Sequence, residues 1–195
     1  VLVQNLNDEH TALPLPAPFD YLPEGTKQCI FWGLGSDGTV GANKEAIKLI
    51  VANTPLYGQA YFAYSAHKSG GLTESHLRFG AKPIDAPYFI QSADYIACHN
   101  PAYLKKFDVI KSLKKDGIFV MNIADGTNFD EALPAAMRRK LASLNAKVYA
   151  IDASALAVKL GLPGRINMIM QAAFFSLSNI LPTDKLMKLL KASIA

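Results

Sequence analysis

The chain has 195 residues, which suits one domain, and half of them are apolar, which allows a full core and argues against disorder. No apolar run approaches the roughly 18 residues of a membrane span, and no signal peptide is visible. The net charge of +4 permits an acidic ligand, but zinc-finger spacings, RNA-binding aromatic strands and long basic runs are missing from the sequence. We expect neither a membrane protein nor a nucleic-acid binder.

The two cysteines, Cys29 and Cys98, each lie in an apolar, strand-like run. Two thiols without a CxxC spacing do not form a structural zinc or iron–sulfur site by themselves. We therefore expect no metal site, and two buried, reduced thiols in a cytoplasmic protein. Because the sequence begins with Val1, we also expect it to be a piece of a longer polypeptide.

The first part of the chain is polar and then rich in proline. Proline cannot donate to a β-ladder, and it disfavours helix in the residue before it. Residues 1–24 are therefore predicted to be an extended lead-in or linker. Residues 25–195 are predicted to form a single α/β domain.

From residue 28 onward, strand-like and helix-like segments alternate. The expected strands are 28–32, 59–64, 73–79, 88–90, 95–98, 118–122 and 147–151. The expected helices are 40–53, 103–113, 131–144 with a break at Pro134, a short helix capped by Asp152, and 166–181. This alternation predicts a three-layer α/β/α fold around an open, mostly parallel, doubly wound, Rossmann-like sheet. Ligands of such sheets bind beyond the carboxyl ends of the strands.

A glycine-rich stretch follows the first expected strand and leads into the first expected helix. Residues 33–44 read GLGSDGTVGANK, in which Gly33, Gly35 and Gly38 have the G-x-G-x-x-G spacing. Small residues let the backbone approach an anion, and free amides at a helix start point toward it. We interpret this stretch as a phosphate-binding loop. The alternative is that the glycines serve only a tight turn and close helix packing.

A dinucleotide-binding fold would place an acidic residue at the end of the second strand, where it binds a ribose. Here the segment from Tyr64 to Lys68 has no carboxylate, and Lys68 instead suits a phosphomonoester. An NADP-binding domain is therefore a further, less favoured alternative. Asp37 inside the loop is unusual, because its charge would repel a phosphate.

Two other pairs of polar residues give less specific signals. His76 and Arg78 alternate on one expected strand, so they share a face and can contact a neighbouring domain, water or, least favoured, a substrate. His99 and Asn100 follow a strand end, where they either reach the ligand cleft or form a local turn before Pro101. The sequence supports no Ser/His/Asp arrangement, so we expect no catalytic residue in this chain.

The stretch 31–44 is joined by three more: 68–80 (KSGGLTESHLRFG), 93–103 (ADYIACHNPAY) and 161–171 (GLPGRINMIMQ). In order and spacing, these four resemble the gamma-type region, domain III, of pyruvate:ferredoxin (or flavodoxin) oxidoreductase. The resemblance runs from about Gly25 to the end of the chain. It implies a multidomain enzyme that converts pyruvate to acetyl-coenzyme A and CO2 and passes electrons to ferredoxin or flavodoxin. Thiamine diphosphate, magnesium and iron–sulfur clusters are implied in other domains.

The ligand that the resemblance assigns to this domain is coenzyme A. Its implied contacts are Ser36, Asp37, Gly38, Thr39, Val40, Lys68 and Asn167. The family usually has a second lysine where this chain has His67, which makes the phosphate pocket less positive. The implied partners are other domains or subunits of the enzyme. The alternative function is a module that only packs between domains, with an idle glycine loop.

Overall fold

The structure is a computed structural model that describes residues 21–65, 71–182, 184–185, 188–189 and 191. Most of the expected lead-in therefore lies outside the described residues, and its boundary with the domain stays a prediction. Within the described ranges, no helix is both long and apolar enough to cross a membrane.

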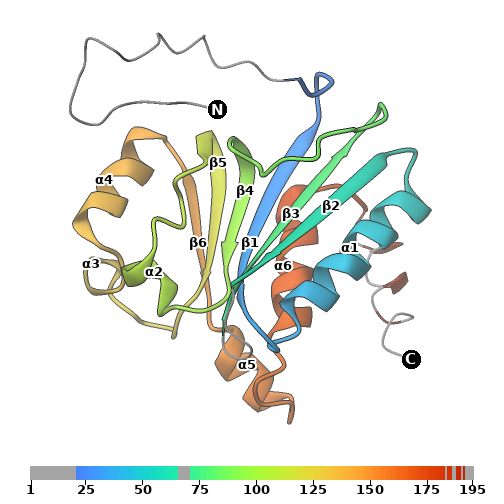
Figure 1. The fold of residues 1–195 in the computed structure, drawn as a ribbon. Helices are drawn as coiled ribbons and strands as arrows, with labels where there is room; N and C mark the ends of the chain where they lie inside the picture. Colours follow the sequence, from blue (N-terminus) through green and yellow to red (C-terminus); the bar gives the residue numbers. More distant parts are fainter. Residues whose placement is uncertain (1–20, 66–70, 183, 186–187, 190, 192–195) are drawn as a thin grey trace, which may run out of the picture.

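A six-stranded sheet forms the centre of the molecule, in the order β2-β3-β1-β4-β5-β6 (Figure 1). The strands are β1 (Lys27–Leu34), β2 (Tyr57–Tyr64), β3 (Leu72–Gly80), β4 (Ala93–Cys98), β5 (Leu113–Asn122) and β6 (Lys147–Ile151). β1, β4, β5 and β6 pair in parallel, whereas β3 is antiparallel to both β1 and β2. β2 therefore runs in the same direction as β1, and β3 is the reversed strand. The predicted mostly parallel sheet is confirmed.

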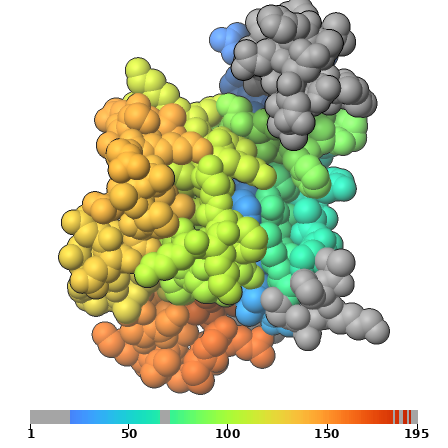
Figure 2. Space-filling view, turned by 60° about the vertical axis from the view of Figure 1, so that its left-hand side comes forward, coloured from blue at the N-terminus to red at the C-terminus, as the bar shows by residue number. Residues whose placement is uncertain are grey.

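Helices lie on both faces of the sheet. α1 (Thr39–Asn53) and α6 (Asn167–Ser178) cover one face, around a core that includes Phe31 and Phe174. α2 (Tyr103–Lys106), α3 (Phe129–Ala132) and α4 (Ala135–Ser143) lie on the other side, where the core includes Phe119. Figure 2 turns this second side forward, with α4 in orange. α5 (Ala153–Lys159) follows β6 at the lower end of the sheet in Figure 1. The three-layer prediction is confirmed.

Two signals for helix boundaries are confirmed. α3 ends at Ala132 and α4 begins at Ala135, so Pro134 divides the expected helix. The Asp152 carboxylate accepts a hydrogen bond from the Ala155 amide at 2.8 Å and caps α5.

Two expected elements are wrong. Residues 88–90 are not a strand but part of an irregular segment that follows β3. The helix expected over 103–113 ends at Lys106, and β5 already begins at Leu113. Val109 and Ile110 are instead buried in the second core from a compact turn. These apolar side chains are therefore buried in the core without forming part of a helix.

Candidate functional site

The glycine loop connects β1 to α1 at the carboxyl edge of the parallel strands. A Cβ atom on Gly33 would lie 2.7 Å from the Thr39 side chain, so only glycine allows the helix to start this close to the strand. Thr39 is fully buried, and its Oγ1 lies 2.9 Å from Nδ1 of His99. The Thr39 side chain thus points into the protein and anchors the helix start.

The Asp37 carboxylate shapes the loop from within. Its Oδ2 accepts from the Leu34 amide at 2.8 Å, and its Oδ1 accepts from the Thr39 amide at 2.7 Å. The Asp37 amide itself donates to the Leu34 carbonyl at 3.0 Å. The charge is therefore stabilised by amides at the helix start, which explains a carboxylate inside this loop. The amides of Asp37 and Thr39 are already occupied by protein acceptors.

Other amides of the loop remain available. Those of Ser36, Gly38, Val40 and Gly41 make no hydrogen bond within the described part of the chain. Ser36 and Gly38 have φ angles of 74° and 85°, in the left-handed region. Left-handed residues at intervals in a turn form a concave nest of amides that binds anions. The first amides of a helix also lack partners inside the helix.

Asn167 reaches the same loop from another part of the sequence. It is the first residue of α6, and its Nδ2 would lie 3.0 Å from a Cβ placed on Gly38. The starts of α1 and α6 therefore converge at Gly38. Both helix dipoles direct partial positive charge to this point, which favours a negatively charged ligand.

A hollow of about 380 Å³ opens beside the loop. Its walls are the loop and the facing ends of β2 and β3. The lining residues are Leu34, Gly35, Ser36, Asp37, Gly38, Val40, Gly41, Tyr64, Ser65, Gly71, Leu72 and Thr73. The Gly35 amide donates to the Gly71 carbonyl at 2.7 Å, which joins the two walls.

Lys68 and His67 lie outside the described residues, in the segment 66–70. Ser65 and Gly71, which flank that segment, both line the hollow. The predicted contact of Lys68 with a phosphate stays a prediction. The described residues that line the hollow at the end of β2 are Tyr64 and Ser65, and neither has a carboxylate.

Of the alternatives for His76 and Arg78, the contact with water is wrong, because these residues are only 2% and 1% exposed. Arg78 donates to the Gln28 side chain at 3.2 Å and to the carbonyls of Ala86 and Tyr88 at 3.1 and 2.8 Å. Nδ1 of His76 accepts from the Ile90 amide at 3.2 Å. Both residues therefore hold the segment 81–92 on the sheet.

His99 and Asn100 have separate roles. Asn100 Oδ1 accepts from the Ala102 amide at 3.0 Å, which confirms the expected local turn. His99 is only 3% exposed, and burial lowers its pKa to about 4, although the nearby Asp37 raises it slightly. The neutral imidazole supports Thr39 below the glycine loop. No spacing in the sequence indicated this support.

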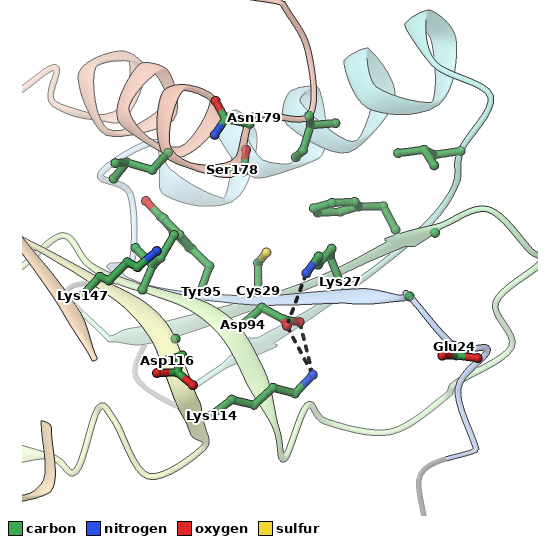
Figure 3. Close-up of a pocket in the computed structure, with 18 of the residues that line it drawn as sticks. Glu24, Lys27, Cys29, Asp94, Tyr95, Lys114, Asp116, Lys147, Ser178 and Asn179 are labelled. Carbon is green, nitrogen blue, oxygen red and sulfur yellow. Dashed lines mark hydrogen bonds and ion pairs between the residues drawn. The ribbon is translucent and has the colours of Figure 1, made fainter. Parts of the chain in front are cut away.

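A second hollow, of about 590 Å³, lies at the amino ends of β1 and β4 (Figure 3). Asp94 is central to it and pairs with Lys27 at 3.9 Å and Lys114 at 3.3 Å. α6 ends here, at Ser178, so the helix presents carbonyl groups rather than amides. The end of α6 therefore does not favour an anion at this edge, whereas the two helix starts at the glycine loop do.

Both cysteines are free and buried, as predicted. Burial raises the pKa of Cys98 to about 12 and that of Cys29 well above its ordinary value. Neither thiol is thus a reactive nucleophile at neutral pH. In the part of the chain that the structure describes, no three His, Cys, Asp or Glu side chains are grouped to hold a metal ion.

Comparison with solved structures finds the same fold in two other proteins. A pyruvate oxidoreductase subunit from Thermotoga maritima has a TM-score of 0.67 at 20% identity, over 87% of this chain and 83% of that one. A 2-oxoglutarate:ferredoxin oxidoreductase from Magnetococcus marinus has a TM-score of 0.63 at 20% identity, over 86% of this chain and 26% of that one. These likenesses concern the fold.

Sequence comparison gives the family. The pyruvate:ferredoxin oxidoreductase of Moorella thermoacetica is 48% identical over 95% of this chain, and the pyruvate-flavodoxin oxidoreductase of Enterobacter agglomerans is 49% identical over 97%. The chain spans 16% of the length of each. A family model described as pyruvate ferredoxin/flavodoxin oxidoreductase matches residues 28–195. The chain therefore belongs to the pyruvate ferredoxin/flavodoxin oxidoreductase family.

Proposed function

We propose that this chain is the coenzyme A-binding domain of an enzyme that oxidises pyruvate to acetyl-coenzyme A and CO2. The observation that carries the proposal is the group of amides at Gly38, Val40 and Gly41, which have no acceptor among the described residues and lie where the starts of two helices meet beside Asn167. Coenzyme A carries phosphates, and such a group of donors binds phosphate oxygens.

The role of the domain is positional. It holds coenzyme A so that the thiol reaches the two-carbon unit that other domains produce from pyruvate. Bringing two reactants together in this way contributes roughly 7 kcal/mol or more to an otherwise bimolecular step. Thiamine diphosphate, magnesium and the iron–sulfur clusters belong to other domains in this proposal, and ferredoxin or flavodoxin accepts the electrons. We place the whole enzyme in the cytoplasm.

The test uses the full-length enzyme that carries this chain, with the variants Gly38→Ala and Lys68→Ala. An alanine at position 38 is strained at φ 85° and crowds Asn167. Gly25→Ala is its control, because Gly25 has φ 81° but an open surrounding at the opposite edge. Lys105→Ala on α2 controls for the loss of an exposed lysine.

We expect each test variant to raise the apparent KM for coenzyme A by about tenfold, the effect of losing one hydrogen bond to a charged group. Pyruvate-dependent release of CO2 without coenzyme A should be unchanged. An unchanged KM in both test variants would refute the proposal and favour a module that only packs between domains. Retention on immobilised NADP but not on coenzyme A would favour the NADP-binding alternative.

A further inference from the structure

Two buried hydroxyl groups at the glycine-loop hollow have no hydrogen-bond partner among the residues that the structure describes. Thr73 on β3 is only 3% exposed, lines the hollow, and its Oγ1 makes no hydrogen bond. Ser65, which directly follows β2 and also lines the hollow, is half-buried, but its Oγ atom is buried and likewise unpaired. Leaving a buried hydroxyl unpaired costs about 1–3 kcal/mol. Because Ser65 and Thr73 both line the hollow, a ligand bound there can supply the missing hydrogen-bond partners.

The strand register places Thr73 at the start of the glycine loop. In the sheet, Thr73 lies between Gly33 on β1 and Tyr64 on β2. Side chains alternate along β3, so Thr73 shares the α1-facing side with the core residue Leu77. The hydroxyl thus lies on the same side of the sheet as the start of α1. The amides of Gly38 and Val40 line the same hollow.

Several polar groups of the residues that line this hollow are free to donate hydrogen bonds. The loop amides can only donate, and the two hydroxyls are free to donate as well. Both Asp37 carboxylate oxygens are already bonded to amides of the loop. A matching ligand group must therefore offer several acceptor oxygens close together. Within coenzyme A, adenine and the pantetheine arm both contain donors, whereas the diphosphate contains only acceptors.

We infer that Thr73 and Ser65 bind the diphosphate of coenzyme A and determine which part of the ligand lies at the glycine loop. This inference rests on the proposed function. Neutral amides and hydroxyls suit diphosphate oxygens, each phosphorus of which carries one charge. The 3′-phosphate is a dianion, for which a basic side chain is the better partner. Among the described residues that line the hollow, none is a lysine or an arginine.

The test uses Thr73→Val in the full-length enzyme, because valine has nearly the shape of threonine and replaces only the hydroxyl by a methyl group. Thr73→Ser restores the hydroxyl and is the matched control. Binding is measured by calorimetry with three probes: coenzyme A, dephospho-coenzyme A, which lacks the 3′-phosphate, and pantetheine, which lacks the adenosine, the 3′-phosphate and the diphosphate. The thermal unfolding midpoint is measured without ligand.

We expect Thr73→Val to weaken coenzyme A and dephospho-coenzyme A by the same factor, about tenfold, and to leave pantetheine unaffected. Ser65→Ala should act in the same way. Thr73→Ser should bind like the unmodified enzyme. The unfolding midpoint of Thr73→Val should be unchanged or higher, because an unpaired buried hydroxyl has been removed. A merely structural hydroxyl would instead make the valine variant less stable.

Other results overturn the inference. If Thr73→Val weakens the binding of coenzyme A but not of dephospho-coenzyme A, the 3′-phosphate lies at Thr73. If it weakens the binding of pantetheine, the pantetheine arm lies there. Unchanged binding of all three probes, while Gly38→Ala still raises the KM for coenzyme A, would reject the hydroxyls and leave the proposed function intact. If Gly38→Ala and Lys68→Ala also have no effect, the proposed function and this inference fail together.

Discussion

At the scale of single residues, Thr39 connects the helix start to the sheet. Its side chain fills the space that a Cβ on Gly33 would need, and its hydroxyl pairs with His99 at 2.9 Å. His99 is in turn fixed through its backbone, since its amide donates to the Trp32 carbonyl and its carbonyl accepts from Asn122. The ends of β1, β4 and β5 thus support one position of the glycine loop.

Replacing Thr39 by valine tests this connection. The variant keeps the volume but leaves Nδ1 of buried His99 without its partner, so we expect the free energy of unfolding to fall by about 1–3 kcal/mol. Urea unfolding of the 195-residue chain measures this. Thr127→Val is the control, because its hydroxyl bond to the Ala124 carbonyl is exposed, and it should cost less than about 1 kcal/mol. Equal losses in both variants would contradict a special role for the buried pair.

At the scale of elements, the irregular segment 81–92 depends on β3. Arg78 binds two of its carbonyls, at Ala86 and Tyr88, and the guanidinium also lies 4.8 Å from the centre of the Tyr88 ring. His76 adds a contact with the Phe89 ring at 5.1 Å. A segment without ladder hydrogen bonds is thereby held on the sheet by side chains of one strand.

We expect Arg78→Lys to release this segment. Lysine keeps the charge but lacks the planar fork that reaches two carbonyls and a side-chain amide at once. The free energy of unfolding should fall by about 2 kcal/mol, and amide exchange should accelerate in residues 81–92 before the rest of the chain. Mass spectrometry of exchanged peptides measures this, with exposed Arg139→Lys as the control. Uniform acceleration across the sheet would show that Arg78 stabilises the whole fold instead.

The elements that were predicted correctly carry local signals. The strand 147–151 matches β6 fully, and the division at Pro134 and the Asp152 cap follow from single residues. The errors at 88–90 and 103–113 have a different origin. There, apolar residues such as Ile90 and Ile110 are buried by contacts with distant parts of the chain, which spacing alone does not reveal. Tertiary packing has overridden the local pattern.

At the scale of the whole molecule, some parts of the site could be predicted from the sequence and others could not. The glycine loop was predicted from its own spacing and context. Asn167 came only from the family resemblance, and the structure brings it to Gly38. Thr73, Ser65 and the support from His99 were not predicted, because their roles depend on burial and register between strands. Ordinary polar residues in a strand give no such signal.

The two described histidines lie on opposite faces of the sheet and together make the stability of the whole fold depend on pH. Burial lowers the pKa of His76 and of His99 to about 4, from an ordinary value of 6.5. Arg78 and Lys111 lower that of His76 further, while Asp37 partly opposes the shift of His99. Between pH 6.5 and about 4, the unfolded chain therefore binds more protons than the folded chain.

Stability should accordingly rise as the pH rises from about 4 to 6.5 and gain nothing further from these groups above that range. Each histidine contributes at most about 1.4 kcal/mol per pH unit. Glu74, beside His76, opposes the trend because burial raises its pKa. Urea unfolding of the 195-residue chain at several pH values measures how the free energy of unfolding changes with pH. His76→Gln should reduce this slope by up to the contribution of one histidine. Parallel curves for the variant and the unmodified chain would mean that His76 takes up its proton equally well in the folded state.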